Sequence, residues 1–375
     1  MEEGHHTAVM PKFVPGLELA ERFYRDAVRP ILNTKCPGLS HSAGLIGAGS
    51  EVLGFDTPVS SDHHWGPRVQ LFVTEDAYAQ HADAILEVLR HTLPHTFLGW
   101  PTSFTEPNPD DHGTQLLRAT TSGPVNHRVD VTTPRRFFLH YLGFDLREAL
   151  DPIDWLTLPS QKLRSIVASE LFHDAIGLDD ARHRFEWYPH DVWLYLLASG
   201  WQRIGQQEHL MGRAGQVGDE VGSALVASLL VRDLMRLCFL MERQYAPYAK
   251  WYGTAFAQLK SASALTPLFS HALRADTWVA RDRALGEAYA IVAEAQNALA
   301  MSEPQPAEVQ RFFGRPFSVI FGERFAKALQ VRIKDSSVKE IPLLIGSIDQ
   351  LTDSTDVLEA TALRARLKAL YHPAQ

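Results

Sequence analysis

The stretch GAGSEVLGFDTPVSSDHHWGPRVQLFV, from Gly47 to Val73, decides the predicted fold. A strand that ends at Ile46 precedes a glycine–serine turn, and we expect Gly49 and Ser50 to open a short helix. A second turn follows, and a strand is then predicted to begin at Asp62 and to continue through the apolar residues after it. This order of strand, glycine turn and acidic strand start is typical of a site that binds a phosphorylated ligand.

The residue types in this order indicate the chemistry of phosphate and metal binding. Glycine lets backbone N–H groups approach an anion, and the Ser50 hydroxyl adds a donor, so the turn is predicted to seat a triphosphate. A carboxylate at Asp62 is predicted to hold Mg²⁺ against the phosphates. Asp130, in the predicted strand NHRVDVTTP, supplies a further carboxylate for in-line displacement at phosphorus with two metal ions.

Longer segments of the sequence resemble a known family. The segments GSEVLGFDTPVSSDHHWGPR, GRAGQVGDEVGS and YAPYAKWYGTAF look like the bacterial family known as domain of unknown function 4037. The Gly-Ser pair, spacer and acidic strand start also resemble the DNA polymerase beta-type nucleotidyltransferase superfamily. These resemblances imply a nucleotidyltransferase core followed by a helical bundle, as in kanamycin nucleotidyltransferase-like enzymes. They imply transfer of a nucleotidyl group from an NTP, such as ATP, to a hydroxyl acceptor that they do not identify.

The superfamily pattern can be carried over residue by residue. It assigns Gly49 and Ser50 to the phosphate-binding turn, Asp62 to the first metal ligand and Asp130 to the third carboxylate. His64 stands where the superfamily has Asp or Glu. Imidazole suits Mn²⁺ or a later transition metal better than Mg²⁺. The change therefore leaves three outcomes open: Mn²⁺ in place of Mg²⁺, reduced activity, or a module of the same fold that only binds a nucleotide or a protein.

Other interpretations of the same residues remain open. Asp130 can instead pair with Arg128 or Arg135 at the strand edge. A transition-metal site can be drawn from His63 and His64 together with His127 or His112. A metal hydrolase that uses His63, His64 and Asp62 is the least favoured function, because no spaced ligand motif such as His-Glu-x-x-His is present. Glu51 and Asp56 are interpreted as turn residues.

Two cations in the second half of the chain are predicted to contact the nucleotide. Arg213 offers a planar guanidinium for phosphate, and Lys250 lies between Tyr248 and Trp251. The alternatives are a helix-connecting loop at Arg213 and a snorkelling side chain at Lys250. Two further segments were interpreted as structural: an ion-paired or solvated helix face with Arg232, Arg236 and Arg243, and a turn at Gly346-Ser347.

Periodicity along the chain predicts an α+β fold. Helices are expected at 15–32 and 75–93, strands at 42–46, 67–74, 114–123 and 126–134, and mainly helices from about 160 to 300. We expect a nucleotidyltransferase-like mixed sheet domain over 1–155, a helical bundle over 156–302 and a small C-terminal extension over 303–375. In the bundle, the apolar face of one helix is predicted to consist of Val221, Leu225, Leu229, Leu230, Leu234, Leu237, Leu240 and Met241, and Asp219 or Ser223 is predicted to cap its start.

Composition limits the partners and the compartment. The net charge of −8 argues against a broad nucleic-acid surface. No apolar run approaches the ~20 residues that span a bilayer. Two cysteines cannot form a disulfide framework, so we expect a cytoplasmic protein. The expected ligands are an NTP, a divalent metal (Mg²⁺ or Mn²⁺) and an unknown small-molecule or macromolecular acceptor.

Overall fold

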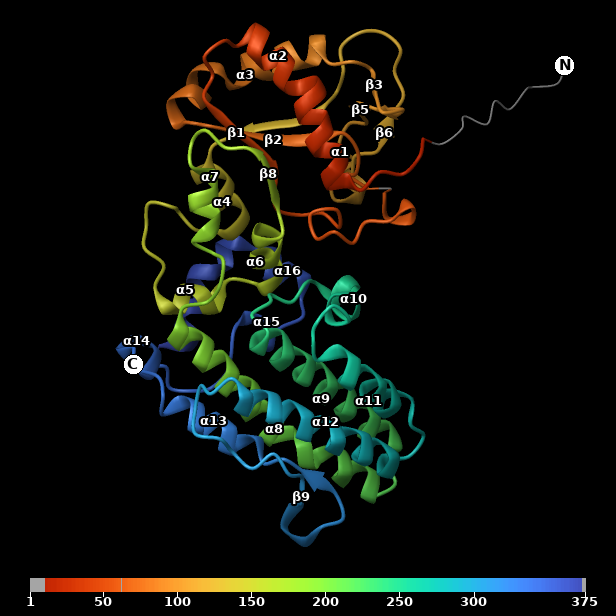
Figure 1. The fold of residues 1–375 in the computed structure, drawn as a ribbon, viewed down its shortest axis with the longest axis vertical. Coiled ribbons are helices and arrows are strands. Elements are labelled where there is room, and N and C mark those ends of the chain that lie inside the picture. The colour runs from red at the N-terminus through yellow and green to blue at the C-terminus, as the bar shows by residue number, and fades with distance from the viewer. Residues whose placement is uncertain (1–10, 62, 373–375) are drawn as a thin grey trace, which may run out of the picture. The chain divides into compact units, whose positions relative to one another are not determined.

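The computed structural model describes residues 11–61 and 63–372 (Figure 1). The chain divides into two compact units. The first runs to residue 148 and also takes in residues 165–186, and the second consists of residues 149–164 and the chain from 187 onward. The first unit contains a mixed sheet and the second is mainly helical, so the predicted α+β class is confirmed. Residues 303–375, predicted as a separate extension, lie within the second unit.

A four-stranded sheet with the order β7-β2-β1-β8 forms the centre of the first unit. β2 runs parallel to β7 and antiparallel to β1, and β1 is antiparallel to β8. The strands are β1 His41–Leu45, β2 Arg68–Val73, β7 Arg128–Thr132 and β8 Glu170–His173. Three of the predicted strands are therefore found, whereas β8 lies in a region that we expected to be helical.

Alternation along these strands gives the sheet one apolar face. Val69 and Leu71 of β2 and Val129 of β7 pack against helices, in a cluster with Phe23, Leu32, Ile85 and Leu89. The helices of this unit are α1 Gly16–Phe23, joined by the π-helical turn Tyr24–Val28 to α2 Arg29–Lys35, then α3 Glu75–Thr92, α4 Pro134–Leu142 and α7 Leu178–His183. Thr74 caps α3 by accepting from the Ala77 N–H at 3.2 Å, which fixes the start of this helix beyond β2.

Short strand pairs lie between α3 and β7. They are β3 Thr96–Phe97 with β4 Trp100–Pro101, and β5 Ser103–Phe104 with β6 Leu117–Arg118. The strand predicted over 114–123 is reduced to the two residues of β6, followed by turns that reach Gly123 in the left-handed conformation (φ +81°).

Long helices build the second unit. The main ones are α8 His190–Gln216, α9 Glu220–Met241, α11 Ala262–Arg274, α12 Trp278–Ala298 and α13 Gly322–Gln330, seen side by side in Figure 1. Shorter elements are α5 Pro152–Thr157, α6 Ser160–Val167, α10 Tyr252–Phe256, β9 Gln310–Arg311, β10 Ser318–Val319, α14 Ser336–Lys339, α15 Ile348–Leu351, α16 Thr355–Glu359 and α17 Arg364–Leu367. Throughout the described ranges, every helix is too short or too polar to cross a bilayer.

The buried face of α9 agrees with the predicted one only in its second half, where Leu230, Leu234, Leu237 and Met241 are buried. Val221 and Leu225 are 74% and 63% exposed, so the first half of the predicted apolar face is wrong. The buried positions follow the 3–4 spacing of a helix face: Ser223, Ala227, Leu230, Leu234, Leu237 and Met241. The face begins with small residues because Ser223 meets Arg281 of α12 at 3.3 Å. The predicted cap is confirmed, since Asp219 accepts from the Gly222 N–H at 2.7 Å.

Candidate functional site

Four polar residues of β2 and β7 project from one face of the sheet. The parallel register places Arg68 opposite Arg128 and Gln70 opposite Asp130. Side chains alternate along a strand, so all four point away from the apolar face formed by Val69 and its neighbours. We call Arg68, Gln70, Arg128 and Asp130 the polar sheet face. A helix, α4, covers part of this side of the sheet farther along β2, where Phe137 packs on Phe72.

The glycine turn is fastened to the polar sheet face. Gln70 Oε1 accepts from the Ile46 N–H at 2.8 Å, and Arg68 Nη2 donates to the Ala48 carbonyl at 3.0 Å. Gly49 has φ +143°, and a Cβ there would lie 2.6 Å from Glu51 Oε2 and 2.7 Å from Arg68 Nη2. The backbone conformation requires glycine, and a Cβ would also push the Glu51 and Arg68 side chains aside.

The turn does not lead into a helix, so that prediction is wrong. Ser50 and Glu51 instead start a hydrogen-bonded turn, closed by the Phe55 N–H on the Ser50 carbonyl at 2.9 Å and by the Gly54 N–H on the Glu51 carbonyl at 3.0 Å. Gly54 at φ +69° ends the turn. No helix dipole therefore contributes here, and backbone N–H groups and nearby arginines are what the turn offers an anion.

Two carboxylates near the turn have structural partners. Glu51 and Arg68 form an ion pair of 2.5 Å with side chains only 6% and 11% exposed. Asp56 accepts from the Gly16 N–H at 2.7 Å and from Trp65 Nε1 at 2.9 Å. These contacts agree with the interpretation of Glu51 and Asp56 as turn residues.

His64 is held by the polar sheet face. Arg128 Nη1 donates to His64 Nδ1 at 2.5 Å. Burial, followed by repulsion from the Arg128 and Arg68 guanidiniums, lowers the pKa of His64. Burial and Arg68 also lower the pKa of Arg128. His64 has φ +55° and precedes β2, which begins at Arg68. Because Arg128 donates to it, the imidazole is a neutral acceptor just before this strand.

Asp62 and Asp130 are the two predicted catalytic carboxylates. Asp62 lies outside the described residues. Asp130 is exposed on β7, in register with Gln70 of β2, and its side chain makes no hydrogen bond or ion pair with another described residue. The alternative partners considered for it are engaged elsewhere, since Arg128 contacts His64 and Arg135 pairs with Asp145 at 2.8 Å.

The described residues alone do not form a metal centre. Leaving out Asp62 and the two chain ends, no group of three His, Cys, Asp or Glu side chains is arranged to hold a metal ion. His127, considered as a ligand, uses both ring nitrogens: Nε2 contacts the Leu86 carbonyl at 3.1 Å and Nδ1 accepts from the Val129 N–H at 3.1 Å. Within the described ranges, His63 and His64 therefore do not form a metal-binding group with His127 or His112.

The two cations assigned to nucleotide binding belong to the second unit. Arg213 is exposed in the last turn of α8, not in a loop. Lys250 Nζ lies 4.9 Å from the centre of the Trp251 ring, in a 3₁₀ turn over Ala249–Trp251. An ammonium over an aromatic ring is the arrangement that the snorkelling interpretation of Lys250 describes.

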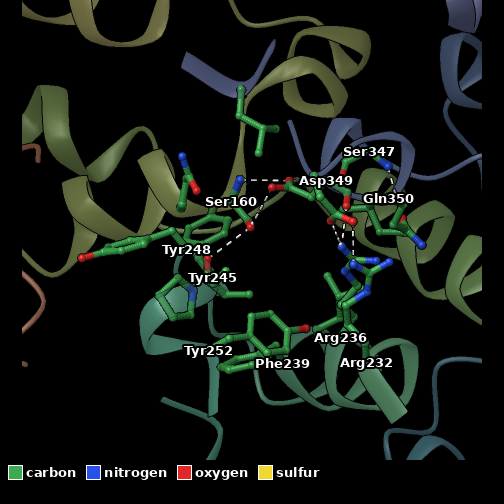
Figure 2. Close-up of a pocket in the computed structure, with 18 of the residues that line it drawn as sticks. Ser160, Arg232, Arg236, Phe239, Tyr245, Tyr248, Tyr252, Ser347, Asp349 and Gln350 are labelled. Atoms are coloured by element: carbon green, nitrogen blue, oxygen red, sulfur yellow. Dashed lines mark hydrogen bonds and ion pairs between the residues drawn. The ribbon is translucent and has the colours of Figure 1, made fainter. Parts of the chain in front are cut away.

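The second unit contains a cavity of about 510 Å³ that we did not predict. Figure 2 shows aromatic side chains on one side, including Tyr245, Tyr248 and Tyr252, and Arg236 and Asp349 on the other. Arg236 is ion-paired, as expected, with Asp233 at 3.2 Å, yet it also lines this cavity. The segment interpreted as a turn at Gly346-Ser347 caps α15, which carries Asp349.

A family model described as "Domain of unknown function (DUF4037)" matches residues 155–252. Two of the three segments on which the family resemblance was based, 212–223 and most of 245–256, lie within the match. The match also contains most of the residues that line the cavity, whereas the polar sheet face and the glycine turn lie outside it. No curated protein matches the chain.

Proposed function

We propose that the chain is a metal-dependent nucleotidyltransferase that moves a nucleotidyl group from an NTP to an unidentified hydroxyl acceptor. One observation carries this proposal: Asp130 and the Gly49-Ser50 turn come from β7 and from the end of β1, the two strands that flank β2. An unpaired carboxylate thus shares a sheet region with a glycine turn that is fastened to the same face.

Each residue has a stated role in the proposal. Backbone N–H groups at Gly49 and Ser50 bind the triphosphate, and Arg68 keeps the turn in place through Ala48. Asp130 would hold the metal together with Asp62, because the described residues supply too few ligands without Asp62. Mg²⁺ or Mn²⁺ bound there would neutralise charge on the reacting phosphate. The contribution of the protein is mainly positioning and charge compensation.

Nucleotide binding and label transfer test the proposal. Calorimetric titration of each NTP with Mg²⁺ or Mn²⁺ should give saturable binding, which Asp130→Asn weakens when metal is present. Asp83→Asn on α3 is the matched control, since Asp83 is exposed and in the same unit. An NTP labelled at the α-phosphate, incubated with a small-molecule extract, should label an acceptor with the native protein and not with Asp130→Asn. The proposal fails if no NTP binds with either metal.

A second candidate, a nucleotide-binding module without catalysis, is favoured by the contact between Arg128 and His64. This contact occupies one ring nitrogen of His64 with a cation. Arg128, whose contact here is a neutral imidazole, can attract phosphate without any metal. Chelation with EDTA separates the two candidates: affinity for the NTP drops in the enzyme and persists in the module. Ser50→Trp should abolish binding in both, which tests the turn itself.

A further inference from the structure

The cavity of the second unit has walls of two kinds. One wall is aromatic, with Tyr188, Phe239, Tyr245, Tyr248 and Tyr252. Phe239 and Tyr252 meet edge to face at 5.3 Å between ring centres, and Tyr188 and Tyr245 do so at 5.0 Å. Such a wall favours a planar, largely apolar molecule. The volume of about 510 Å³ lies in the range of small-molecule sites.

The opposite wall is polar and rigid. Ser160 donates to Asp349 from its backbone N–H at 2.9 Å and from its hydroxyl at 3.1 Å. Arg236 Nη2 donates to the Asp349 backbone carbonyl at 2.6 Å. Arg232 pairs with Asp353 at 2.6 Å. The contacts among Ser160, Asp349 and Arg236 order this part of the wall before any ligand arrives, which reduces the entropy cost of binding.

The charges that line the cavity compensate one another. The arginines and carboxylates in the lining are two guanidiniums, Arg232 and Arg236, and two carboxyl groups, Asp349 and Asp353. Burial raises the pKa of Asp349, while the hydrogen bonds from Ser160 and the nearby Arg236 favour its ionised form. The pKa of Asp353 is lowered by Arg232, although burial opposes this. A cation or an anion entering the cavity would therefore meet a repelling partner beside each attracting one.

Two donors in the wall lack an acceptor. Arg232 Nε and the Tyr252 hydroxyl are buried and have no hydrogen-bond partner among the described residues. Burial raises the pKa of Tyr252, so its hydroxyl stays protonated. Figure 2 shows this hydroxyl pointing toward Arg236. Buried donors are normally paired, so an acceptor atom that reached them would remove an existing penalty.

We propose that this cavity is a binding site for an uncharged, planar ring compound that carries a hydrogen-bond acceptor. Nucleobases and aromatic amides share this chemistry. The ring lies against the tyrosines, and its carbonyl oxygen or ring nitrogen accepts from Tyr252 and Arg232 as the side chains covering these donors adjust. This inference goes beyond the proposed nucleotidyl transfer and needs neither metal nor phosphate.

Probes of matched shape test the class of ligand. Benzamide, nicotinamide, uracil and cytosine are titrated into the full chain by ligand-observed NMR, in metal-free buffer. Benzoate and benzylamine serve as charged counterparts of benzamide. At least one neutral probe should bind saturably, and the two charged counterparts should bind about tenfold more weakly than benzamide. Absence of binding by all four neutral probes, or a preference for benzoate or benzylamine, overturns the proposal.

A pair of tyrosine variants tests the place of binding. Tyr252→Phe removes one unpaired hydroxyl from the cavity wall and should weaken the neutral probe about tenfold. Tyr289→Phe removes an equally buried, unpaired hydroxyl from α12, outside the cavity, and should leave binding unchanged. Neither variant should lower the melting temperature, because neither hydroxyl has a partner. Equal affinity for the probe in both variants would exclude Tyr252 and overturn the proposal.

Discussion

The polar sheet face, together with Glu51 of the neighbouring turn, has two arginines and two carboxylates, as the cavity does, but the two regions arrange them differently. On the sheet face, Arg68 is neutralised by Glu51, Arg128 faces a neutral imidazole, and Asp130 stays exposed. In the cavity, Arg232 faces Asp353, while Arg236 and Asp349 are tied into the same wall. An open carboxylate suits chemistry on ions, whereas compensated charges suit recognition of a neutral molecule.

The largest expected effect comes from breaking the ion-pair network behind the cavity. Asp233, 2% exposed, joins Arg203 at 2.7 Å and Arg236 at 3.2 Å. Asp233→Asn keeps the volume of the side chain and removes its negative charge, so the guanidiniums of Arg203 and Arg236 lose a shared carboxylate partner. We expect a loss of about 3–5 kcal/mol in the free energy of unfolding of the second unit. Urea unfolding measures this loss. Asp353→Asn, at a carboxylate that is 66% exposed, should cost under ~1 kcal/mol, and equal losses would contradict the prediction.

Glu208 is a buried carboxylate that is hydrogen-bonded to backbone groups, in contrast to Asp233, which is paired with arginines. Glu208 accepts from the backbone N–H groups of Ile320 and Gly322, at 2.5 and 3.1 Å, and burial raises its pKa to about 7. The folded protein binds the Glu208 proton more tightly than the unfolded chain does. The contribution of Glu208 to the free energy of unfolding is therefore complete below pH ~4.5 and is lost as the pH rises to about 7. The decline should approach about 3 kcal/mol and be absent in Glu208→Gln. Unfolding at several pH values measures the difference between the two proteins. Parallel pH profiles would rule out Glu208 as the source.

The Glu51–Arg68 pair should have a smaller effect, in the first unit. Glu51→Gln leaves Arg68 half-paired and loosens its contact with the Ala48 carbonyl. We expect a loss of about 1–3 kcal/mol in unfolding free energy and weaker NTP binding, because the turn is less ordered. Thermal unfolding with and without NTP gives both quantities. The control is Glu18→Gln, which removes an exposed pair with Arg22 on α1 and should change neither.

His64 should give the smallest effect, a shift in pH dependence. A free histidine titrates near pH 6.5, but burial and Arg128 lower the pKa of His64. Any metal binding that needs the neutral imidazole should therefore persist at pH 6.5 and weaken only below it. Mn²⁺ titrations at pH 6.5 and 5.5 test this in the native protein and in His64→Asp, which should shift the preference toward Mg²⁺. Identical metal preference in both proteins would make His64 a bystander.

Local patterns predicted the elements whose residues alternate or repeat clearly. The alternation in β2 and β7 and the capped period of α3 were sufficient to place them. β8 was missed because it is four residues long and lies between helical segments. The face of α9 was misassigned because its buried positions begin with Ser223, whose partner Arg281 is far along the chain.

The candidate site was predictable only in part for the same reason. The alternating pattern of the strand predicted that Asp130 lies on β7, and the residue types predicted the glycine turn. The ion pair between Glu51 and Arg68 and the contact between Arg128 and His64 depend on the folded sheet. The cavity was beyond local patterns, because Ser160 and Asp349 meet across a sequence separation of 189. Its arginines looked like an ordinary ion-paired helix face, which they also are.

The return of the chain to the first unit at residues 165–186 has a practical consequence for fragments and for synthesis on the ribosome. β8 covers one edge of β1, a strand whose five residues are all buried. A nascent or engineered chain that stops near residue 150 leaves that edge uncovered and ready to pair with other chains. A fragment that completes the first unit reaches residue 186 and carries residues 149–164, which pack in the other unit, as an insert. The apparent domain boundary at the prolines near 152–159 is therefore a poor place to cut.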